Sequence, residues 1–427
     1  MMQVHRVRSV ATTRALMAAL LPLMAACSGM LKSNAPDEQV YVLHAAVISG
    51  FVFREPGIGE YLSRLDIGVS IFFLISGFLM YRPFVLAHFE DRPGPGLRDY
   101  FVGRFLRIYP AYWVALIAVV WVFQQPGPMH QINDVGDFIA YFGLLQQYSA
   151  AHAYGGIQQA WTLCVEVAFY VFLPLWALGI RAVVRRVGSR PTGAVRVELI
   201  GLALLFATGI AYRMIVLTIE PANSVEISWL PAFFDQFALG MLLAVVSAGR
   251  EAGRMRVSVA DTVGRHPWVC WIVAAVGFWL VATQLGLPIG YPTFSRTQWL
   301  TWTLGYGFIA FAMLLPAVFG DQRQSLLRRA LVHPIIVFLG LVSFGVYLWH
   351  ELWLDRFFHS TGMTPFDPGA NVVAVFLFAM SLSIVAGYFS WTLVERPAMR
   401  LRPGRRGEHV SLDRRAADEG LGDGTPR

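Results

Sequence analysis

Ionisable side chains inside apolar runs are the first candidates for chemistry in this sequence. Glu166, Arg213 and Asp235 each lie about six residues from one end of such a run, and His350 reaches the same level in another. Charges within a bilayer are costly, so residues of this kind mark substrate paths, relays or catalytic groups. We therefore expect one shared polar layer. It is either a substrate-binding cluster or an ion-pair network that joins neighbouring helices.

A histidine, an arginine pair and a tryptophan complete the set of candidate groups. His44 lies in the first apolar run, where an imidazole can act as a general base or simply pack with a hydrogen-bonded partner. Arg104 and Arg107 are three residues apart and share one helix face, so they can grip the phosphates of a charged donor. Their alternative role is to anchor the helix at the membrane boundary. Trp161 is either an interfacial aromatic or a substrate contact.

The composition shows what kind of elements must position these groups. Of 427 residues, 56 % are apolar and only 14 % are charged, whereas soluble globular proteins have about 45–50 % and about 25 %. This excludes a solvated single domain, a disordered chain and a nucleic-acid-binding protein, despite the net charge of +7. Because one crossing takes about 20 apolar residues, we expect an all-α polytopic membrane protein, a bundle of about ten transmembrane helices.

Ten apolar runs alternate with connections of contrasting charge. The runs are 40–53, 66–84, 108–124, 160–180, 197–219, 229–248, 268–286, 298–319, 332–354 and 371–394. If these runs cross the membrane, 29 basic residues lie on one side and four on the other. By the positive-inside rule both termini are then cytoplasmic. The connection 125–159, which contains no lysine or arginine, lies outside.

The chain divides into one membrane domain and two flanking segments. Residues 1–39 are expected to be a cytoplasmic or interfacial segment, and residues 40–397 the transmembrane domain. Residues 398–427, rich in arginine, aspartate and glycine, indicate a disordered basic cytoplasmic tail. The apolar stretch 15–30 also resembles a signal peptide, whose cleavage would move every later connection to the opposite side. The three cysteines fit neither a disulfide framework nor a zinc site, and we expect no metal.

Two functional classes are compatible with charged groups at these depths. A transporter of a small glycoside or lipid uses midplane charges as a relay, usually with broken helices in paired halves of the chain. No such pairing is evident in this sequence. A membrane enzyme instead places a charged donor against the arginine pair and a second substrate near the other polar layer.

Six short motifs occur in one collinear order along residues 40–397. They are DIGVSIFFLISGFL at 66–79, RFLRIYPAYW at 104–113, WTLCVEVAFY at 161–170, FFDQFALG at 233–240, SFGVYLWH at 343–350 and ERP at 395–397. This order resembles the acyltransferase-3 family of integral-membrane acyltransferases. The resemblance implies a ten-helix bundle in the cell (plasma) membrane. That bundle moves an acyl group, acetyl by default, from cytoplasmic acyl-CoA to a hydroxyl of an extracytoplasmic carbohydrate, glycolipid or glycoside.

The resemblance also assigns roles to individual residues. His44 matches the essential histidine of the family, and Arg104 and Arg107 match its arginine pair. Glu166, in the WTLCVE motif, matches the glutamate of its fourth helix. His44 and Glu166 are thus the expected catalytic residues, and the two arginines the expected acyl-CoA site. The expected acceptor contacts are Trp161, Arg213, Asp235 and His350.

One departure from the family pattern lies ahead of His44. The family usually has an aspartate-glycine-leucine-arginine string there, whose arginine precedes the histidine by eleven positions. This chain has Ser33 at that position, next to Lys32. Either the N-terminal sequence is misassigned, or a functional residue has been lost and the chain is an inactive family member.

Overall fold

The computed structural model is a bundle of long helices. It describes residues 59–125, 130–187, 191–219, 225–288, 294–319, 333–363 and 372–402. Every regular element in these ranges is helical, and nine helical segments there are long and apolar enough to cross a membrane. The predicted all-α polytopic bundle is therefore confirmed. The first predicted run, 40–53, and the candidate base His44 lie outside the described residues.

The nine segments coincide with the nine later apolar runs. The first five are Gly59–Phe89, with α3 (Gly59–Leu62) and α4 (Ile67–Phe89); Leu97–Val122, with α5 (Leu97–Ile117) and η1 (Ala118–Val122); Gln158–Arg186, with η4 (Gln158–Ala160) and α7 (Trp161–Val187); Gly193–Ile219, in α8 (Pro191–Ile219); and Leu230–Glu251, with η6 (Leu230–Phe233) and α9 (Phe234–Glu251). The last four are Pro267–Gln284, with α11 (Pro267–Trp279) and η7 (Leu280–Gln284); Arg296–Phe319, which is α12; Pro334–Thr361, which is α14; and Val373–Arg400, with α15 (Val372–Ser390), η8 (Trp391–Glu395) and α16 (Arg396–Arg400).

Shorter elements connect these segments. Between the second and third lie α6 (Val135–Phe142) and the 3-10 turn η3 (Gln146–Tyr148). The turn η5 (Val225–Ser228) precedes η6, and α10 (Ser258–Arg265) joins α9 to α11.

The start of α5 differs from the sequence expectation. The apolar run begins near residue 108, but the helix begins at Leu97, because a helix continues through arginines whose stems pack on apolar surface while their charged ends reach polar surroundings. Arg104 and Arg107 therefore follow the first residue of α5 by seven and ten positions, which is about 10 and 15 Å at 1.5 Å per residue. Both arginines therefore lie within the helix and not in its first turn.

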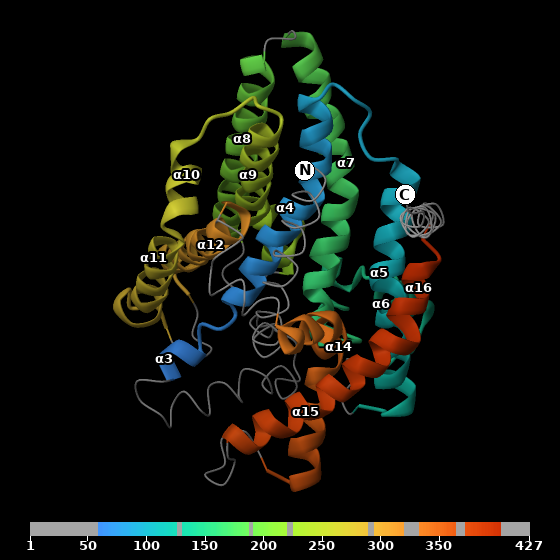
Figure 1. The fold of residues 1–427 in the computed structure, drawn as a ribbon. Coiled ribbons are helices and arrows are strands. Elements are labelled where there is room, and N and C mark those ends of the chain that lie inside the picture. The colour runs from blue at the N-terminus through green and yellow to red at the C-terminus, as the bar shows by residue number, and fades with distance from the viewer. Residues whose placement is uncertain are drawn as a thin grey trace, which may run out of the picture.

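The helices α4, α7 and α9 form the centre of the bundle, and α8 runs beside α9 on its outer side (Figure 1). Glycines allow α4 and α9 to approach closely. A Cβ atom on Gly77 would lie 2.5 Å from the carbonyl oxygen of Phe237, and one on Gly240 would overlap the carbonyl of Leu74. Such small residues are typical of tight helix crossings in membranes, where packing rather than the hydrophobic effect holds helices together.

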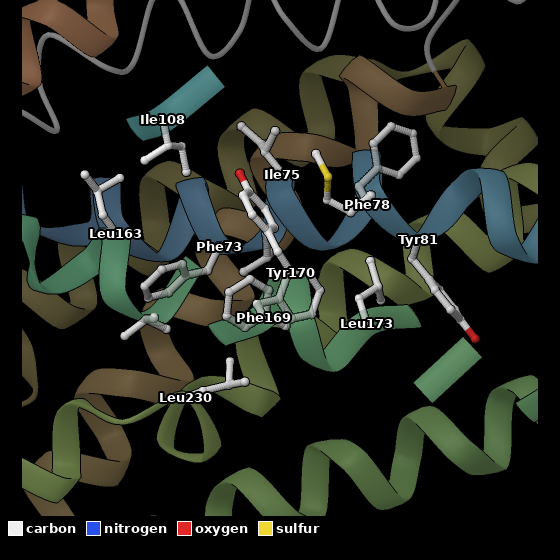
Figure 2. Close-up of a cluster of buried hydrophobic side chains, with 14 of the residues drawn as sticks. Phe73, Ile75, Phe78, Tyr81, Ile108, Leu163, Phe169, Tyr170, Leu173 and Leu230 are labelled. Carbon is white, nitrogen blue, oxygen red and sulfur yellow. The ribbon is translucent and has the colours of Figure 1, made fainter. Parts of the chain in front are cut away.

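Aromatic side chains fill the space between these central helices. Phe73 of α4, Phe169 of α7 and Phe237 of α9 are fully buried. The rings of Phe169 and Phe237 stack with centroids 3.9 Å apart, and the ring of Phe73 lies 4.9 Å from that of Phe237. Figure 2 shows Phe73 and Phe169 beside each other, with Tyr170 and Leu173 on the following part of α7. This packing holds the first turns of α7, which carry the predicted glutamate, in a fixed position.

The peripheral helices turn apolar side chains outward. Leu204 of α8, Ile272 of α11 and Leu377 of α15 are each more than half exposed. A hydrophobic surface on a long helix is stable against lipid tails but not against water. The exposed faces thus agree with a multi-pass membrane protein.

Candidate active site

Glu166 is a buried carboxylate held by two hydroxyl groups. It follows the first residue of α7 by five positions and is 6 % exposed. Its Oε1 accepts a hydrogen bond of 2.5 Å from the Tyr170 hydroxyl, one turn further along α7. The same atom accepts a longer bond of 3.3 Å from Ser76 of α4. A buried ionisable group with such partners has one orientation, which is what a catalytic or positioning group requires.

Arg104 approaches this carboxylate from α5. Its guanidinium lies 5.8 Å from the ring centre of Tyr100 and 5.7 Å from that of Tyr170, distances at which a cation is attracted to an aromatic face. The charges of Arg104 and, to a smaller extent, Arg107 act on Glu166. Within the described residues Arg104 forms no ion pair. Its N–H groups are therefore not committed to a carboxylate there.

Arg107 is held differently from Arg104. Its Nη1 lies 3.0 Å from Oε2 of Glu395, at the end of the π-helical turn η8, and its guanidinium lies 5.5 Å from the ring centre of Phe344. The Glu395 side chain is 1 % exposed, whereas that of Arg107 is 35 % exposed. The two predicted arginines thus face one region of the bundle, one between aromatic rings and the other beside a carboxylate.

Arg213 and Asp235 form a separate pair. Nη2 of Arg213 on α8 lies 3.1 Å from Oδ1 of Asp235 on α9, and the same nitrogen donates to the carbonyl of Ala232. Both side chains are 2 % exposed. Arg213 and Asp235 are thus brought together, whereas the hydrogen bonds of Glu166 come from Tyr170 and Ser76. The geometry favours the ion-pair network over the substrate-binding cluster, because each charge is already compensated.

The two other predicted acceptor contacts, Trp161 and His350, are also buried. Trp161 begins α7 and packs against Phe233, with ring centres 5.8 Å apart. Nδ1 of His350 lies 2.7 Å from the carbonyl oxygen of Tyr347, one turn earlier in α14, and the two rings are 6.3 Å apart. Among the described residues, the hydrogen bonds of Glu166 come instead from Tyr170 and Ser76.

Comparison with known proteins identifies the family of this chain. A family model described as an acyltransferase domain matches residues 40–391, most of the chain. The chain belongs to the acyltransferase-3 family. The matched range contains α3 to α15 and all of the residues around Glu166 except Glu395. No solved structure matches the chain.

Several named proteins are similar to the chain. The acyltransferase MdmB of Streptomyces mycarofaciens is 28 % identical over 371 residues, which are 83 % of this chain and 86 % of that protein. Nodulation protein 10 of Rhizobium leguminosarum bv. viciae is 23 % identical and covers 78 % of this chain and 82 % of its own length. A Staphylococcus aureus (strain COL) protein, provisionally named an O-acetyltransferase, is 22 % identical over 79 % of this chain. The chain spans about half of that longer protein, 53 %.

Three partners in the site were missed by sequence reasoning. Tyr170 stands four positions after Glu166, a spacing that places both on one helix face and carries a usable signal. Ser76 and Glu395 come from segments 90 and 288 residues away from the groups they bond. Both lie in the collinear motifs, but only the packing of α4 and η8 shows which residue each one meets.

Proposed function

We propose that this protein is an integral-membrane O-acyltransferase. It moves an acyl group, by default acetyl, from cytoplasmic acyl-CoA to a hydroxyl of an extracytoplasmic acceptor that contains carbohydrate. The observation that carries the proposal is the arrangement of Arg104 between two aromatic rings beside the buried, doubly hydrogen-bonded Glu166. Family membership and the names of the relatives support acyl transfer.

Arg104 and Arg107 are proposed to bind the phosphate groups of acyl-CoA. A guanidinium stacked on aromatic rings keeps its in-plane N–H groups available for an anion. The guanidinium of Arg104 lies 5.8 and 5.7 Å from two ring centres and forms no ion pair within the described residues, while Glu395 orients Arg107 and leaves its side chain one-third exposed. Two oriented guanidinium groups bind a pyrophosphate more tightly than one, since each makes charge-assisted hydrogen bonds.

His44 is proposed to be the general base of the transfer. A hydroxyl is a weak nucleophile at neutral pH, so its proton must be removed as it attacks the thioester. His44 accepts this proton, the acceptor oxygen bonds to the acyl carbonyl carbon, the carbon–sulfur bond breaks, and the thiolate of CoA takes up a proton. Glu166 is proposed to orient the reacting hydroxyl or the imidazole and to stabilise the positive charge that develops on it.

The proposed cellular arrangement follows from the distribution of charge. We place the protein in the cell membrane with both termini in the cytoplasm, because 29 of the 34 basic residues then face the cytoplasm. Segments 1–39 and 398–427 are proposed to lie on that side. The acceptor is then reached from the opposite side, where the connection 125–159 lies.

The release of free CoA thiol tests the proposed reaction. The purified protein in lipid nanodiscs receives acetyl-CoA and a panel of glycosides, and thiol release is compared between the wild type and His44→Ala. Loss of a general base lowers the rate by about 10²–10⁴. His266→Ala changes an exposed histidine before α11 and serves as the matched control. Equal release by the wild type and His44→Ala would remove His44 from the mechanism. Uptake of a glycoside into sealed proteoliposomes without thiol release would identify a transporter.

The departure at Ser33 is tested in the same assay. If the family arginine has been lost, the wild type releases little thiol and Ser33→Arg restores the reaction. If Ser33→Arg leaves an active wild type unchanged, the chain carries out the reaction without that arginine.

A further inference from the structure

An arginine of the C-terminal segment packs against the helix that carries the two predicted arginines. Arg402 follows the last residue of α16 by two positions, and both η8 and α16 contact α5. A Cβ atom on Gly103 of α5 would lie 3.0 Å from Nε and 3.2 Å from Cζ of Arg402. The guanidinium of Arg402 therefore rests on the part of the helix surface that Gly103, which has no side chain, leaves open.

This part of α5 is close to both predicted arginines. Arg107 follows Gly103 by four positions, and residues at this spacing lie on one helix face. Because helical side chains lean toward the N-terminus of their helix, the side chain of Arg107 is directed back toward the turn that contains Gly103. Arg104 is the next residue after Gly103, about 1.5 Å further along the axis. Three guanidinium groups are thus carried to one region of α5.

Arg402 has no carboxylate partner among the described residues. Glu395, on the same C-terminal segment, is paired with Arg107, and Asp99, one turn before Gly103, is exposed and not paired with Arg402. Arg402 makes no hydrogen bond within the described part of the chain either, and its side chain is partly exposed. Its N–H groups can therefore be reached by a ligand, and an anion would offset the repulsion between neighbouring cations.

The order of the groups in acyl-CoA indicates which anion Arg402 would meet. The thioester has to reach the region of Glu166, and the pyrophosphate is assigned above to Arg104 and Arg107. The remaining charged group, the 3′-phosphate of the ribose, is separated from the thioester by the pyrophosphate. Arg402 contacts Gly103, which precedes both arginines in α5 and lies nearer to the end of the helix that the proposed topology places toward the cytoplasm.

We propose that Arg402 binds the 3′-phosphate of acyl-CoA and makes the protein select CoA over dephospho-CoA. A guanidinium presents its N–H groups in a planar fork that matches the oxygens of a phosphate. Arg402 lies beyond residues 40–391, the range that the family model matches. The inference rests on the proposed function and adds to its donor site one residue and a specificity.

Ligand binding tests the inference without requiring turnover. The Kd values of CoA and of dephospho-CoA, which lacks only the 3′-phosphate, are measured by calorimetry on the full-length protein in lipid nanodiscs. In the wild type we expect dephospho-CoA to bind about tenfold more weakly, the lower end for a hydrogen bond to a charged group, because Arg402 is partly exposed. Arg402→Gln should weaken CoA binding by the same factor and leave the Kd of dephospho-CoA within about twofold.

Two variants of the same region serve as controls. Arg400→Gln removes an exposed arginine at the end of α16 and should leave both Kd values within about twofold, since the attraction of an exposed, distant charge is screened. Arg104→Ala should weaken the binding of CoA and of dephospho-CoA alike, because both ligands contain the pyrophosphate. The ratio of the two Kd values is then kept in Arg104→Ala and lost in Arg402→Gln.

Several results would overturn the inference. Equal Kd values of CoA and dephospho-CoA in the wild type would show that the protein does not bind the 3′-phosphate. Unchanged selectivity in Arg402→Gln would assign that phosphate to another group. An equal loss of affinity for both ligands in Arg402→Gln, together with a lower Tm of the ligand-free protein, would show that Arg402 only packs α16 on α5.

The proposed function can be separated from this inference in the same experiment. In each of the three results above CoA still binds, so the donor of the acyltransferase reaction stands while the role of Arg402 fails. A wild type that binds neither CoA nor dephospho-CoA would contradict the proposed donor itself and, with it, the role of Arg402.

Discussion

Arg107 of α5 and Glu395 of η8 form an ion pair of 3.0 Å between residues 288 positions apart in the chain. The Glu395 side chain is 1 % exposed, and its other oxygen, Oε1, lies 3.4 Å from the hydroxyl of Ser390. A carboxylate in this position has exchanged its water shell for these two partners. The pair therefore attaches the C-terminal helical segment to α5 and sets the direction of the Arg107 guanidinium.

Removal of Glu395 should destabilise the bundle more than removal of an exposed glutamate. Glu395→Ala leaves Arg107 without its buried partner, and we expect a loss of about 1–3 kcal/mol. This is below the ~3–5 kcal/mol of a fully buried pair, since the one-third exposure of Arg107 allows solvent to screen it. The matched control is Glu251→Ala, which breaks the partly exposed pair with Arg82 and should cost about 0–1 kcal/mol. Equal Tm values for the two variants would contradict this account.

The sequence was most informative about the helices themselves. Nine apolar runs predicted nine membrane-length helices of the described residues, because an apolar stretch of about 20 residues has few alternatives to a spanning helix. The residues at which the helices begin and end were less predictable. The charged first turns of α5 carry no hydropathy signal, so the apolar run was read from residue 108 although the helix begins at Leu97.

The site was predictable in its residues but not in its contacts. Glu166, Arg104 and Arg107 stood out as charges in or near apolar runs, and the structure places them in one region. Depth put Glu166 in one layer with Arg213 and Asp235, but depth does not say which face of a helix carries a residue or which helix lies opposite it. The hydrogen bonds of Glu166 with Tyr170 and Ser76 could therefore not be predicted.

The pair of Arg213 and Asp235 is predicted to be structural. Arg213→Met alone leaves a buried carboxylate without compensation and should cost about 3–5 kcal/mol. The double variant Arg213→Met with Asp235→Leu removes both charges and should recover most of this loss. The free energies of unfolding of the wild type, Arg213→Met, Asp235→Leu and the double variant form a double-mutant cycle, which gives the coupling energy of the pair. A stable double variant that retains thiol release supports the structural role, whereas a stable double variant with a raised acceptor KM would assign the pair to acceptor binding.

The hydroxyl of Tyr170 is predicted to act through Glu166. Tyr170→Phe removes the 2.5 Å hydrogen bond to Glu166 but keeps the ring on which Arg104 rests. We expect kcat to fall by about 10- to 150-fold, the effect of about 1.5–3 kcal/mol from one hydrogen bond to a charged group, while the KM for acyl-CoA stays within twofold. Glu166→Gln should lower kcat further. A changed donor KM with an unchanged kcat would show that Tyr170 serves the donor site instead.

The side of the membrane on which each connection lies can be tested directly. Because basic residues gather in alternate connections, reporter fusions after residue 150 should report the extracytoplasmic side, and fusions after residues 190 and 260 the cytoplasm. The three positions fall in three different connections, so one inverted segment would be recognised. An extracytoplasmic signal at 190 would reverse the proposed topology and with it the assignment of donor and acceptor sides.

Arg104 is predicted to act on donor affinity. Arg104→Ala removes a guanidinium that is free of ion pairs within the described residues and lies between Tyr100 and Tyr170. Loss of charge-assisted bonds to a phosphate, about 1.5–3 kcal/mol, should raise the KM for acyl-CoA by about 10- to 150-fold. Because kcat should change little, excess acyl-CoA should restore most of the rate. Arg104→Lys should recover only part of the affinity, because an ammonium lacks the planar fork that can stack on a ring and bind phosphate at once.

The control for this prediction comes from the same helix. Arg98 lies in the first turn of α5 and is exposed, so Arg98→Ala removes the same charge without disturbing the contacts of Arg104. Its KM for acyl-CoA should stay within about threefold of the wild type, since the attraction of an exposed charge for a distant ligand is largely screened. If Arg98→Ala and Arg104→Ala raise the donor KM equally, the arginines of α5 act through their summed charge. The specific arrangement of Arg104 beside Glu166 would then not be the donor site.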